Sequence, residues 1–310
     1  MSGIQQQAES WTSEMRAEQA GLDLGADLGP ADPTAFTQRR PIPQPVPLDR
    51  HGPARIIAMA NQKGGVGKTT STINLGAALA EYGRRVLLVD FDPQGALSVG
   101  LGVNPHNLDM SIYNLLMDSS CTVDDILIKT DVAGLHLLPA NIDLSAAEIQ
   151  LVNEVAREMA LARLLRPVRG EYDFILIDCQ PSLGLLALNA LTCAHGVLIP
   201  LECEFFSLRG VALLLDTIDK VRARLNFDLE LEGILATMYD SRTTHCRQVL
   251  QRVVEAFGDK VYQTVITKTV KFPESTVAGT PITTLDPASS GARNYRQLAR
   301  EVIAATAERG

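Results

Sequence analysis

A glycine-rich segment near residue 60 carries the residue types that bind phosphate groups. It reads NQKGGVGKTT from Asn61 to Thr70, after a short apolar run and before a helical pattern. Glycines permit backbone conformations in which successive N–H groups converge on phosphate oxygens. A lysine adds positive charge, and a hydroxyl at the start of the helix suits Mg²⁺. The spacing therefore predicts a phosphate-binding loop, and its working residues are Gly64, Gly65, Gly67, Lys68 and Thr69.

This loop is a variant of the common pattern G-x-x-x-x-G-K-[ST], which would need glycine where the chain has Gln62. A lysine, Lys63, comes directly before the glycines instead. The variant resembles the deviant phosphate loop (Walker A) of the ParA/MinD group of ATPases. That resemblance implies that Lys63 reaches across a dimer to the partner's nucleotide.

Carboxylates follow two further apolar runs. The stretch VLLVDFDPQG places Asp90 and Asp92 at the end of one run, and DFILID ends another run in Asp178. Carboxyl ends of parallel strands meet at one edge of a sheet, so these side chains are expected beside the phosphate loop. Asp92 is the candidate to orient or deprotonate the attacking water. Asp90 and Asp178, with Thr69, are the candidates to hold Mg²⁺.

The elements that must position these residues alternate between strand and helix. Several strand candidates are apolar without interruption, which indicates burial on both faces. The pattern predicts an α/β fold of the P-loop NTPase type: a doubly wound, mostly parallel sheet with helices on both faces. Expected strands cover 55–60, 85–90, 135–139, 173–178, 196–201, 230–238 and 261–265. Expected helices cover 68–82, 145–165, 208–225 and 244–257, with others ending near 194 and beginning near 290.

Composition separates a tail from one large domain. Residues 1–53 are proline-rich, with an extended stretch at 41–53 and a helical pattern at 5–20 that carries Trp11, so we expect a disordered tail. Residues 54–310 are expected to form a single domain. A net charge of −8 argues against a protein that coats nucleic acid. Neither a membrane span nor a disulfide framework is indicated, so a cytoplasmic location is expected.

The chain as a whole resembles the ParA family of chromosome- and plasmid-partitioning ATPases, specifically the short Soj type. The shared stretches are NQKGGVGKTT, VDFDPQG, LIDCQPSLGLL, PLECEFFSLRG and TPIT. The resemblance implies ATP and Mg²⁺ as cofactors, an ATP-dependent homodimer that binds non-specific double-stranded DNA on the nucleoid, and slow hydrolysis stimulated by a ParB-type partner. It also implies that residues 63–70, including Val66 and Thr70, contact the nucleotide, with Lys63, Lys68 and Asp92 in the hydrolytic role.

The resemblance extends to residues 266–276, but with changes. Thr267 and Thr269 stand where similar proteins have proline and asparagine near adenine. Lys268 and Lys271 replace arginines, which keeps the positive charge and loses the bidentate guanidinium. We expect adenine contacts from the two threonines. Phosphate contacts to DNA are expected from Arg242, Arg247, Lys268 and Lys271.

Other interpretations stay open from the sequence. One is a paralogue, MinD-like or regulatory, that positions a protein or membrane cargo. MinD-like proteins end in a lipid-binding helix, whereas the last helix here has Tyr295, Leu298, Val302 and Ile303 at the spacing of a helix packed on the sheet. Another is an iron–sulfur reductase, which would need suitably placed cysteines.

Overall fold

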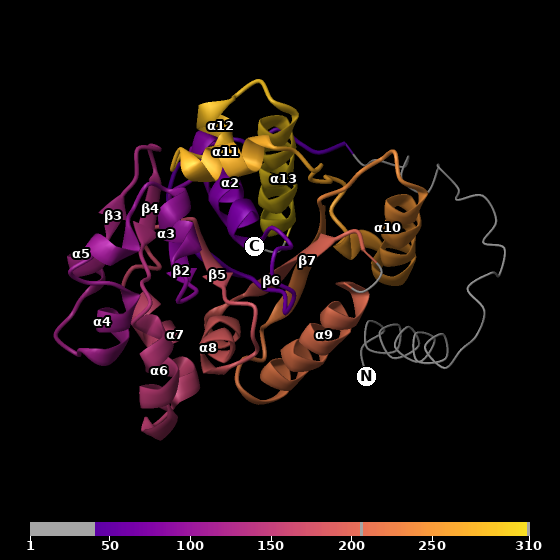
Figure 1. Ribbon diagram of the computed structural model, residues 1–310. Coiled ribbons are helices and arrows are strands. Elements are labelled where there is room, and N and C mark those ends of the chain that lie inside the picture. The colour runs from indigo at the N-terminus through magenta and orange to yellow at the C-terminus, as the bar shows by residue number, and fades with distance from the viewer. Residues whose placement is uncertain (1–40, 205–206, 309–310) are drawn as a thin grey trace.

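A seven-stranded sheet forms the centre of the protein (Figure 1). The structure is a computed structural model that describes residues 41–204 and 207–308. Trp11 and the helix expected at 5–20 lie outside the described residues. The strand order is β3-β4-β2-β5-β1-β6-β7, and every pairing is parallel except that of β3 with β4. The strands are β1 (Arg55–Met59), β2 (Val86–Phe91), β3 (Ile128–Lys129), β4 (Leu135–Leu138), β5 (Phe174–Cys179), β6 (Gly196–Glu202) and β7 (Glu230–Thr237).

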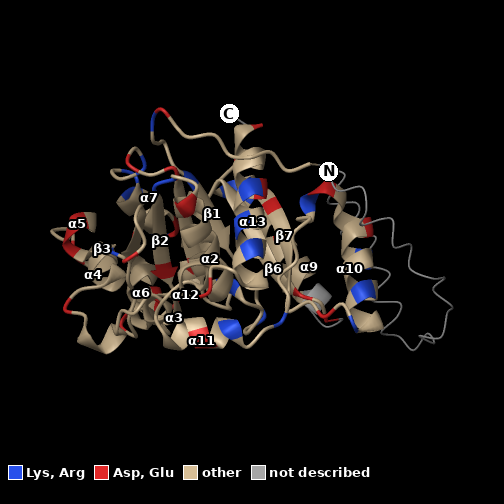
Figure 2. Cartoon of the chain, turned by 90° about the horizontal axis from the view of Figure 1, so that it is seen from above, with Lys and Arg blue, Asp and Glu red and all other residues tan. Residues whose placement is uncertain are grey.

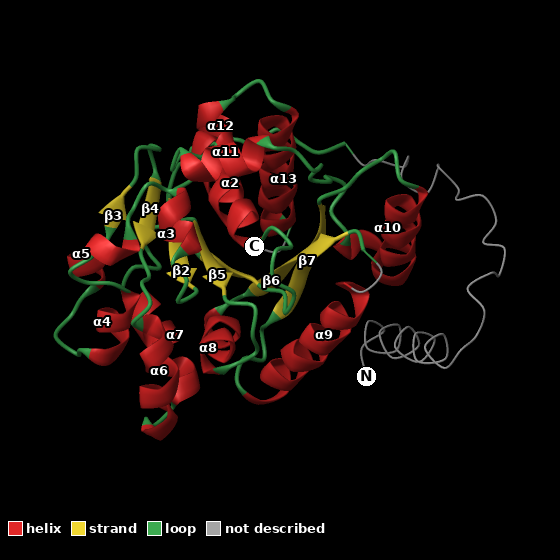
Figure 3. Ribbon diagram, viewed as in Figure 1, coloured by secondary structure: helices red, strands yellow, loops and turns green. Residues whose placement is uncertain are grey.

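Helices cover both faces of this sheet, as Figure 3 shows. One apolar core lies beneath α2 (Lys68–Glu81) and α13 (Ser290–Ala307), and a second lies on the opposite face beneath α8 (Leu185–Cys193), α9 (Ser207–Arg224) and α10 (Thr244–Phe257). Strand β1 contributes side chains to both cores. Ile56 and Ala58 pack in one, and Ile57 and Met59 pack in the other. The predicted doubly wound fold is confirmed.

Short helices connect the main elements. They are α3 (Ala96–Gly100), α4 (Ile112–Met117), α5 (Val123–Ile126), α6 (Leu144–Gln150), α7 (Ala160–Leu165), α11 (Lys271–Val277) and α12 (Ile282–Leu285), with 3₁₀ turns at Pro105–Asn107, Leu151–Asn153, Arg157–Met159 and Gly258–Lys260. The prediction of a single helix over 145–165 is wrong. The helix is interrupted between α6 and α7, where Ala156 has a left-handed φ of 54°, which is incompatible with a continuous right-handed helix.

The strand expected at 261–265 is also absent from the described structure. Only Val261 makes a bridge, to Ile234. The backbone N–H groups of Gln263 and Thr264 donate instead to the carboxylate of Glu301 on α13, at 2.8 and 2.9 Å. A side chain from a helix therefore binds the N–H groups in the middle of the segment, whereas Tyr262 and Ile266 on either side donate to carbonyls of β7 at 3.0 and 2.8 Å.

Residues 41–53 run along the domain rather than away from it. Arg84 donates to the carbonyl of Val46 at 2.8 Å, and Arg300 donates to the carbonyls of Ile42 and Pro43. His51 lies 2.8 Å from the carboxylate of Asp173. These contacts place part of the proline-rich stretch on the surface of the domain, because its carbonyls accept from buried and half-buried donors. The boundary between tail and domain after residue 53 stays a prediction.

The last helix packs as its apolar spacing predicts. Tyr295, Leu298 and Val302 of α13 are buried against α2, and Ile303 packs on the same core. Across the described part of the chain, every helix is too short or too polar to cross a bilayer.

Candidate functional site

The phosphate loop joins β1 to α2 at the carboxyl edge of the sheet. Gly65 and Gly67 have φ of 76° and 84°, a left-handed region that residues with a Cβ rarely adopt. Gly67 is the residue before the first turn of α2, and Lys68 and Thr69 open the helix. Gly64 and Gly65 are exposed, so the backbone N–H groups of the loop remain accessible to a ligand.

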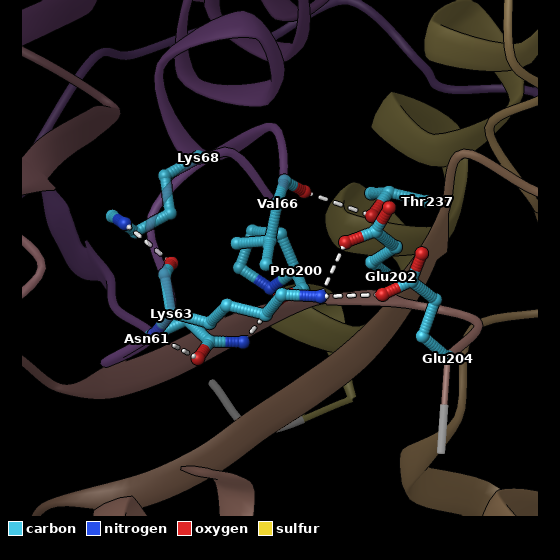
Figure 4. Close-up of polar contacts among 8 residues, drawn as sticks. All are labelled: Asn61, Lys63, Val66, Lys68, Pro200, Glu202, Glu204 and Thr237. Atoms are coloured by element: carbon cyan, nitrogen blue, oxygen red, sulfur yellow. Dashed lines mark hydrogen bonds and ion pairs between the residues drawn. The ribbon is translucent and has the colours of Figure 1, made fainter. Parts of the chain in front are cut away.

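Two buried side chains fix the shape of this loop (Figure 4). Asn61 accepts from the backbone N–H of Lys63 at 3.0 Å and donates to the carbonyl of Pro200 on β6 at 2.7 Å. Thr237, the last residue of β7, donates its hydroxyl to the carbonyl of Val66 at 2.8 Å. The loop is thus tied to the ends of two neighbouring strands.

We expect Thr237→Val to weaken nucleotide binding by roughly 3- to 10-fold, because the Val66 carbonyl loses its buried donor while the side-chain shape is kept. Thr237→Ser retains the hydroxyl and should bind nearly as well as the unmodified protein. Titration with a fluorescent ATP analogue compares the two variants. Equal affinity for both would show that this hydrogen bond does not position the loop.

Lys68, Thr69 and Asp178 meet at the base of the loop. The hydroxyl of Thr69 donates to Asp178 Oδ2 at 2.6 Å. Lys68 is buried, with Nζ 3.3 Å from the carbonyl of Lys63, and burial lowers its pKa although Asp178 opposes the change. A hydroxyl beside a carboxylate is an oxygen donor set of the kind Mg²⁺ prefers, so these residues fit the predicted metal.

Asp90 and Asp92 take different positions. Asp90 is fully buried, and its Oδ2 accepts from the backbone N–H and the hydroxyl of Ser98 at 2.8 and 2.7 Å. Its pKa is raised to about 7, first by burial. Asp92 is half-buried, accepts from the N–H of Gln94 at 3.0 Å, and contributes to the electrostatic environment of Lys68. The metal role of Asp90 and the hydrolytic role of Asp92 stay predictions.

Burial, followed by the charge of Asp90, raises the pKa of Asp178 from 3.8 to about 8. The folded protein thus binds this proton more tightly than the unfolded chain, so its contribution to stability is complete at acidic pH and is lost as pH rises through 8. In metal-free protein, we expect the melting temperature to fall between pH 5 and pH 8.5, and to fall several degrees less in Asp178→Asn. The exposed Asp216→Asn is the control. Parallel pH profiles for all three proteins would contradict this.

Lys63 is held by two acidic side chains of its own chain. Its ammonium lies 2.6 Å from Glu202, the last residue of β6, and 2.8 Å from Glu204 (Figure 4). Burial lowers its pKa, but the hydrogen bonds and charges of the two glutamates outweigh this, and the net shift is upward. Its side chain remains 33% exposed and extends toward the two glutamates, away from the side chain of Lys68 (Figure 4).

The four cations predicted to contact DNA come from two adjacent segments. Tyr239 pairs with Thr267, and the N–H of Lys268 donates to the carbonyl of Tyr239 at 3.3 Å. The loop leading into α10 therefore lies beside the loop leading into α11. Figure 2 shows lysine and arginine on α10 and at α11.

Carboxylates accompany two of these cations. Arg242 makes a bidentate contact with Asp240 at 2.9 and 2.8 Å, and Lys271 lies 3.0 Å from Glu274. Arg242 is 87% exposed, and its hydrogen bonds lower the pKa of Asp240 to about 2. Local acidic charge thus offsets part of the positive field.

Thr267 and Thr269, the predicted adenine contacts, are half-buried in the segment before α11. Thr267 pairs with Tyr239, two residues beyond the Thr237 that holds the phosphate loop. Their position adjoins the site. The contact with adenine stays a prediction.

Several residues of the site escaped sequence reasoning. Glu202 and Glu204 lie in the stretch PLECEFFSLRG, whose similarity to the family was noted without a role for either carboxylate. Thr237 ends an apolar run and carries no motif. Its signal is a polar residue at the carboxyl end of a buried strand, the same signal that identified Asp178.

Comparison with known proteins shows which family this chain is similar to. Residues 54–231 match the family described as AAA domain. The chain is 66% identical over 264 residues to an uncharacterized protein of Mycobacterium tuberculosis, covering 85% of this chain and 83% of that protein. It is 49% identical over 250 residues to sporulation initiation inhibitor protein Soj of Bacillus subtilis, covering 81% and 98%.

A solved structure extends the likeness to the fold. Cobyrinic acid a,c-diamide synthase from Mycobacterium smegmatis, with bound ADP and magnesium, superposes with a TM-score of 0.70 at 46% identity, over 79% of this chain and 92% of that one. Sequence, fold and the geometry of the phosphate loop point to one family. The chain belongs to the ParA/Soj family of chromosome-partitioning ATPases.

Proposed function

We propose that this protein is an ATP-dependent switch, which dimerises with ATP, binds non-specific double-stranded DNA as a dimer on the nucleoid, and is released by hydrolysis. The observation that carries the proposal is the grouping of Lys68, Thr69 and Asp178 beneath a glycine loop that also contains Lys63. The ADP and magnesium of the M. smegmatis structure support ATP and Mg²⁺ as the cofactors.

Each residue has a defined part in hydrolysis. The loop N–H groups and Lys68 bind the phosphates, and Thr69 with Asp178 would hold the metal. Asp92, half-buried and near Lys68, orients the water and accepts its proton. When bound, Mg²⁺ neutralises charge on the phosphate oxygens. Gly65 and Gly67 keep the loop close enough for backbone N–H groups to do the same.

Lys63 supplies the link between nucleotide and dimer. In the single subunit its ammonium is paired with Glu202 and Glu204. For Lys63 to reach a partner's nucleotide, it must exchange these carboxylates for phosphate oxygens. Pairs at this exposure are worth about 1 kcal/mol or less, so the exchange is readily driven by a triphosphate.

DNA binding would use Arg242, Arg247, Lys268 and Lys271, whose segments lie side by side. A ParB-type protein is the proposed stimulator of hydrolysis. The test is ATP-dependent binding to a random-sequence duplex across a salt series, for Asp92→Ala with and without Lys268→Ala/Lys271→Ala. We expect binding with ATP only, weaker in the lysine variant and with a shallower salt dependence. Lys220→Ala, on the exposed side of α9, is the control.

One observation favours a second candidate function, the positioning of a protein or membrane cargo. The carboxylates of Asp240 and Glu274 pair with two of the four cations, which weakens the field offered to DNA. A paralogue that kept the switch but positions a protein or membrane cargo would show this pattern. ATP hydrolysis without DNA binding at low salt would favour that alternative.

A further inference from the structure

The loop that follows Asp178 makes few hydrogen bonds of its own. It covers residues 180–184 and leads from β5 to α8 at the carboxyl edge of the sheet. Gly184 precedes the first turn of α8, and no side chain of the loop caps that helix. The first N–H groups of a helix have no acceptor within the helix, so a side chain from elsewhere in the chain, water or a ligand must accept from them.

Glu148 on α6 supplies that partner. Its Oε1 accepts from the backbone N–H of Leu186, in the first turn of α8, at 3.3 Å. The same oxygen accepts from Nε2 of Gln180, at the start of the loop, at 2.9 Å. One carboxylate thus joins both ends of the loop, and its negative charge lies at the positive end of α8.

Two features show that this contact is built into the fold. A Cβ on Gly184 would lie 2.3 Å from Glu148 Oε1, so the carboxylate occupies space that exists because residue 184 is glycine. Helix α6 is anchored in the core by Leu144 and Ala147, both fully buried. The carboxylate is therefore presented from a fixed element.

We propose that Glu148 is a positioning residue that fixes the 180–184 loop beside Asp178, and so sets how well the site uses Mg²⁺ during hydrolysis. The loop leaves β5 two residues after Asp178, at the sheet edge where ligands of this fold class bind. Without the Glu148 contact, the 180–184 loop becomes more mobile beside the phosphate site, while Lys68 and the glycine loop keep their structure. The inference rests on the proposed hydrolysis at this site.

The test compares Glu148→Ala with Glu148→Gln in the full chain. Alanine removes the acceptor, and we expect hydrolysis to fall roughly 10-fold and the Mg²⁺ concentration for half-maximal rate to rise several-fold, with ATP affinity within about twofold. Glutamine keeps Oε1 and should stay within about threefold. Gln150→Ala, exposed on the same helix, should match the unmodified protein.

A double-mutant cycle with Gln180→Ala sharpens the result. If Gln180 acts through Glu148, its alanine variant has a smaller effect, and adding it to Glu148→Ala changes little further. Equal loss in Glu148→Gln and Glu148→Ala would overturn the role of the acceptor. So would an unchanged Mg²⁺ dependence in Glu148→Ala.

Hydrogen exchange separates this inference from the function it rests on. In Glu148→Ala, amide exchange should speed up in the peptide spanning 180–188 and stay unchanged in α2 and α13. This outcome does not depend on turnover. If the unmodified protein does not hydrolyse ATP, the proposed function is wrong. The exchange result still shows whether Glu148 holds the 180–184 loop in place. Uniformly faster exchange throughout the chain, or none, would reject the positioning role.

Discussion

Replacing Lys68 with alanine should weaken ATP binding roughly 100-fold or more, the largest loss expected from any single change in this chain. Its ammonium is buried at the start of α2, where burial already lowers its pKa. The negative charge of a bound triphosphate would pair with this buried ammonium group. Charge-assisted hydrogen bonds contribute about 1.5–3 kcal/mol each, and the lysine is expected to make more than one. Isothermal titration with ATP in Mg²⁺ measures the loss.

Lys220→Ala is the matched control, because it also removes one positive charge but from an exposed pair with Asp216 on α9. Its affinity should equal that of the unmodified protein. If Lys68→Ala kept an affinity within a few-fold of the unmodified protein, the assignment of the phosphate site would be wrong.

Replacing Asp92 with alanine should lower the rate of hydrolysis about 100-fold while leaving ATP affinity within about twofold. Asp92 lies just past the end of β2 and is half-buried, and its Oδ1 accepts a local hydrogen bond from the N–H of Gln94 at 3.0 Å. The carboxylate can therefore turn toward a water without breaking the core. Single-turnover hydrolysis beside equilibrium binding separates the two effects.

Asp92→Asn refines this prediction, since it keeps the acceptor for the Gln94 N–H and removes the base. We expect it to be nearly as slow as alanine. A rate close to the unmodified protein in Asp92→Asn would assign the residue a role in loop structure alone.

The sheet was predictable because its physics is local. Runs such as FILID and VLLVD are apolar at every position before a final aspartate, which indicates burial on both faces of the strand. The phosphate loop was also predictable from a local pattern, because glycines and a lysine at this spacing are typical of phosphate binding. The confirmed fold and the grouping of Thr69 with Asp178 both follow from such runs.

What escaped prediction depends on contacts between distant parts of the chain. Lys63 is paired with Glu202 and Glu204, which follow it in the sequence by well over a hundred positions. Likewise, the 261–265 segment has strand composition, but Glu301 of the last helix binds the N–H groups of Gln263 and Thr264 and interrupts the pairing with β7. No local pattern encodes either arrangement. Both arise from which elements the sheet order brings together.

The same reasoning explains residues 41–53. Proline excludes helix and sheet, so an extended chain was expected, but the composition says nothing about where it lies. Arg84 and Arg300 decide that, because their guanidinium groups face carbonyls of this stretch. Those arginines carry no motif that would have revealed the contact.

The most direct test of the proposed switch is the mass of the protein in solution with ATP and with ADP. Sedimentation equilibrium would compare Asp92→Ala with Asp92→Ala/Lys63→Ala, so that hydrolysis does not drain the ATP state. We predict a dimer with ATP and a monomer with ADP for the first, and a monomer in both nucleotides for the second. The same mass in ATP and ADP, or an ATP dimer that forms without Lys63, would contradict the switch.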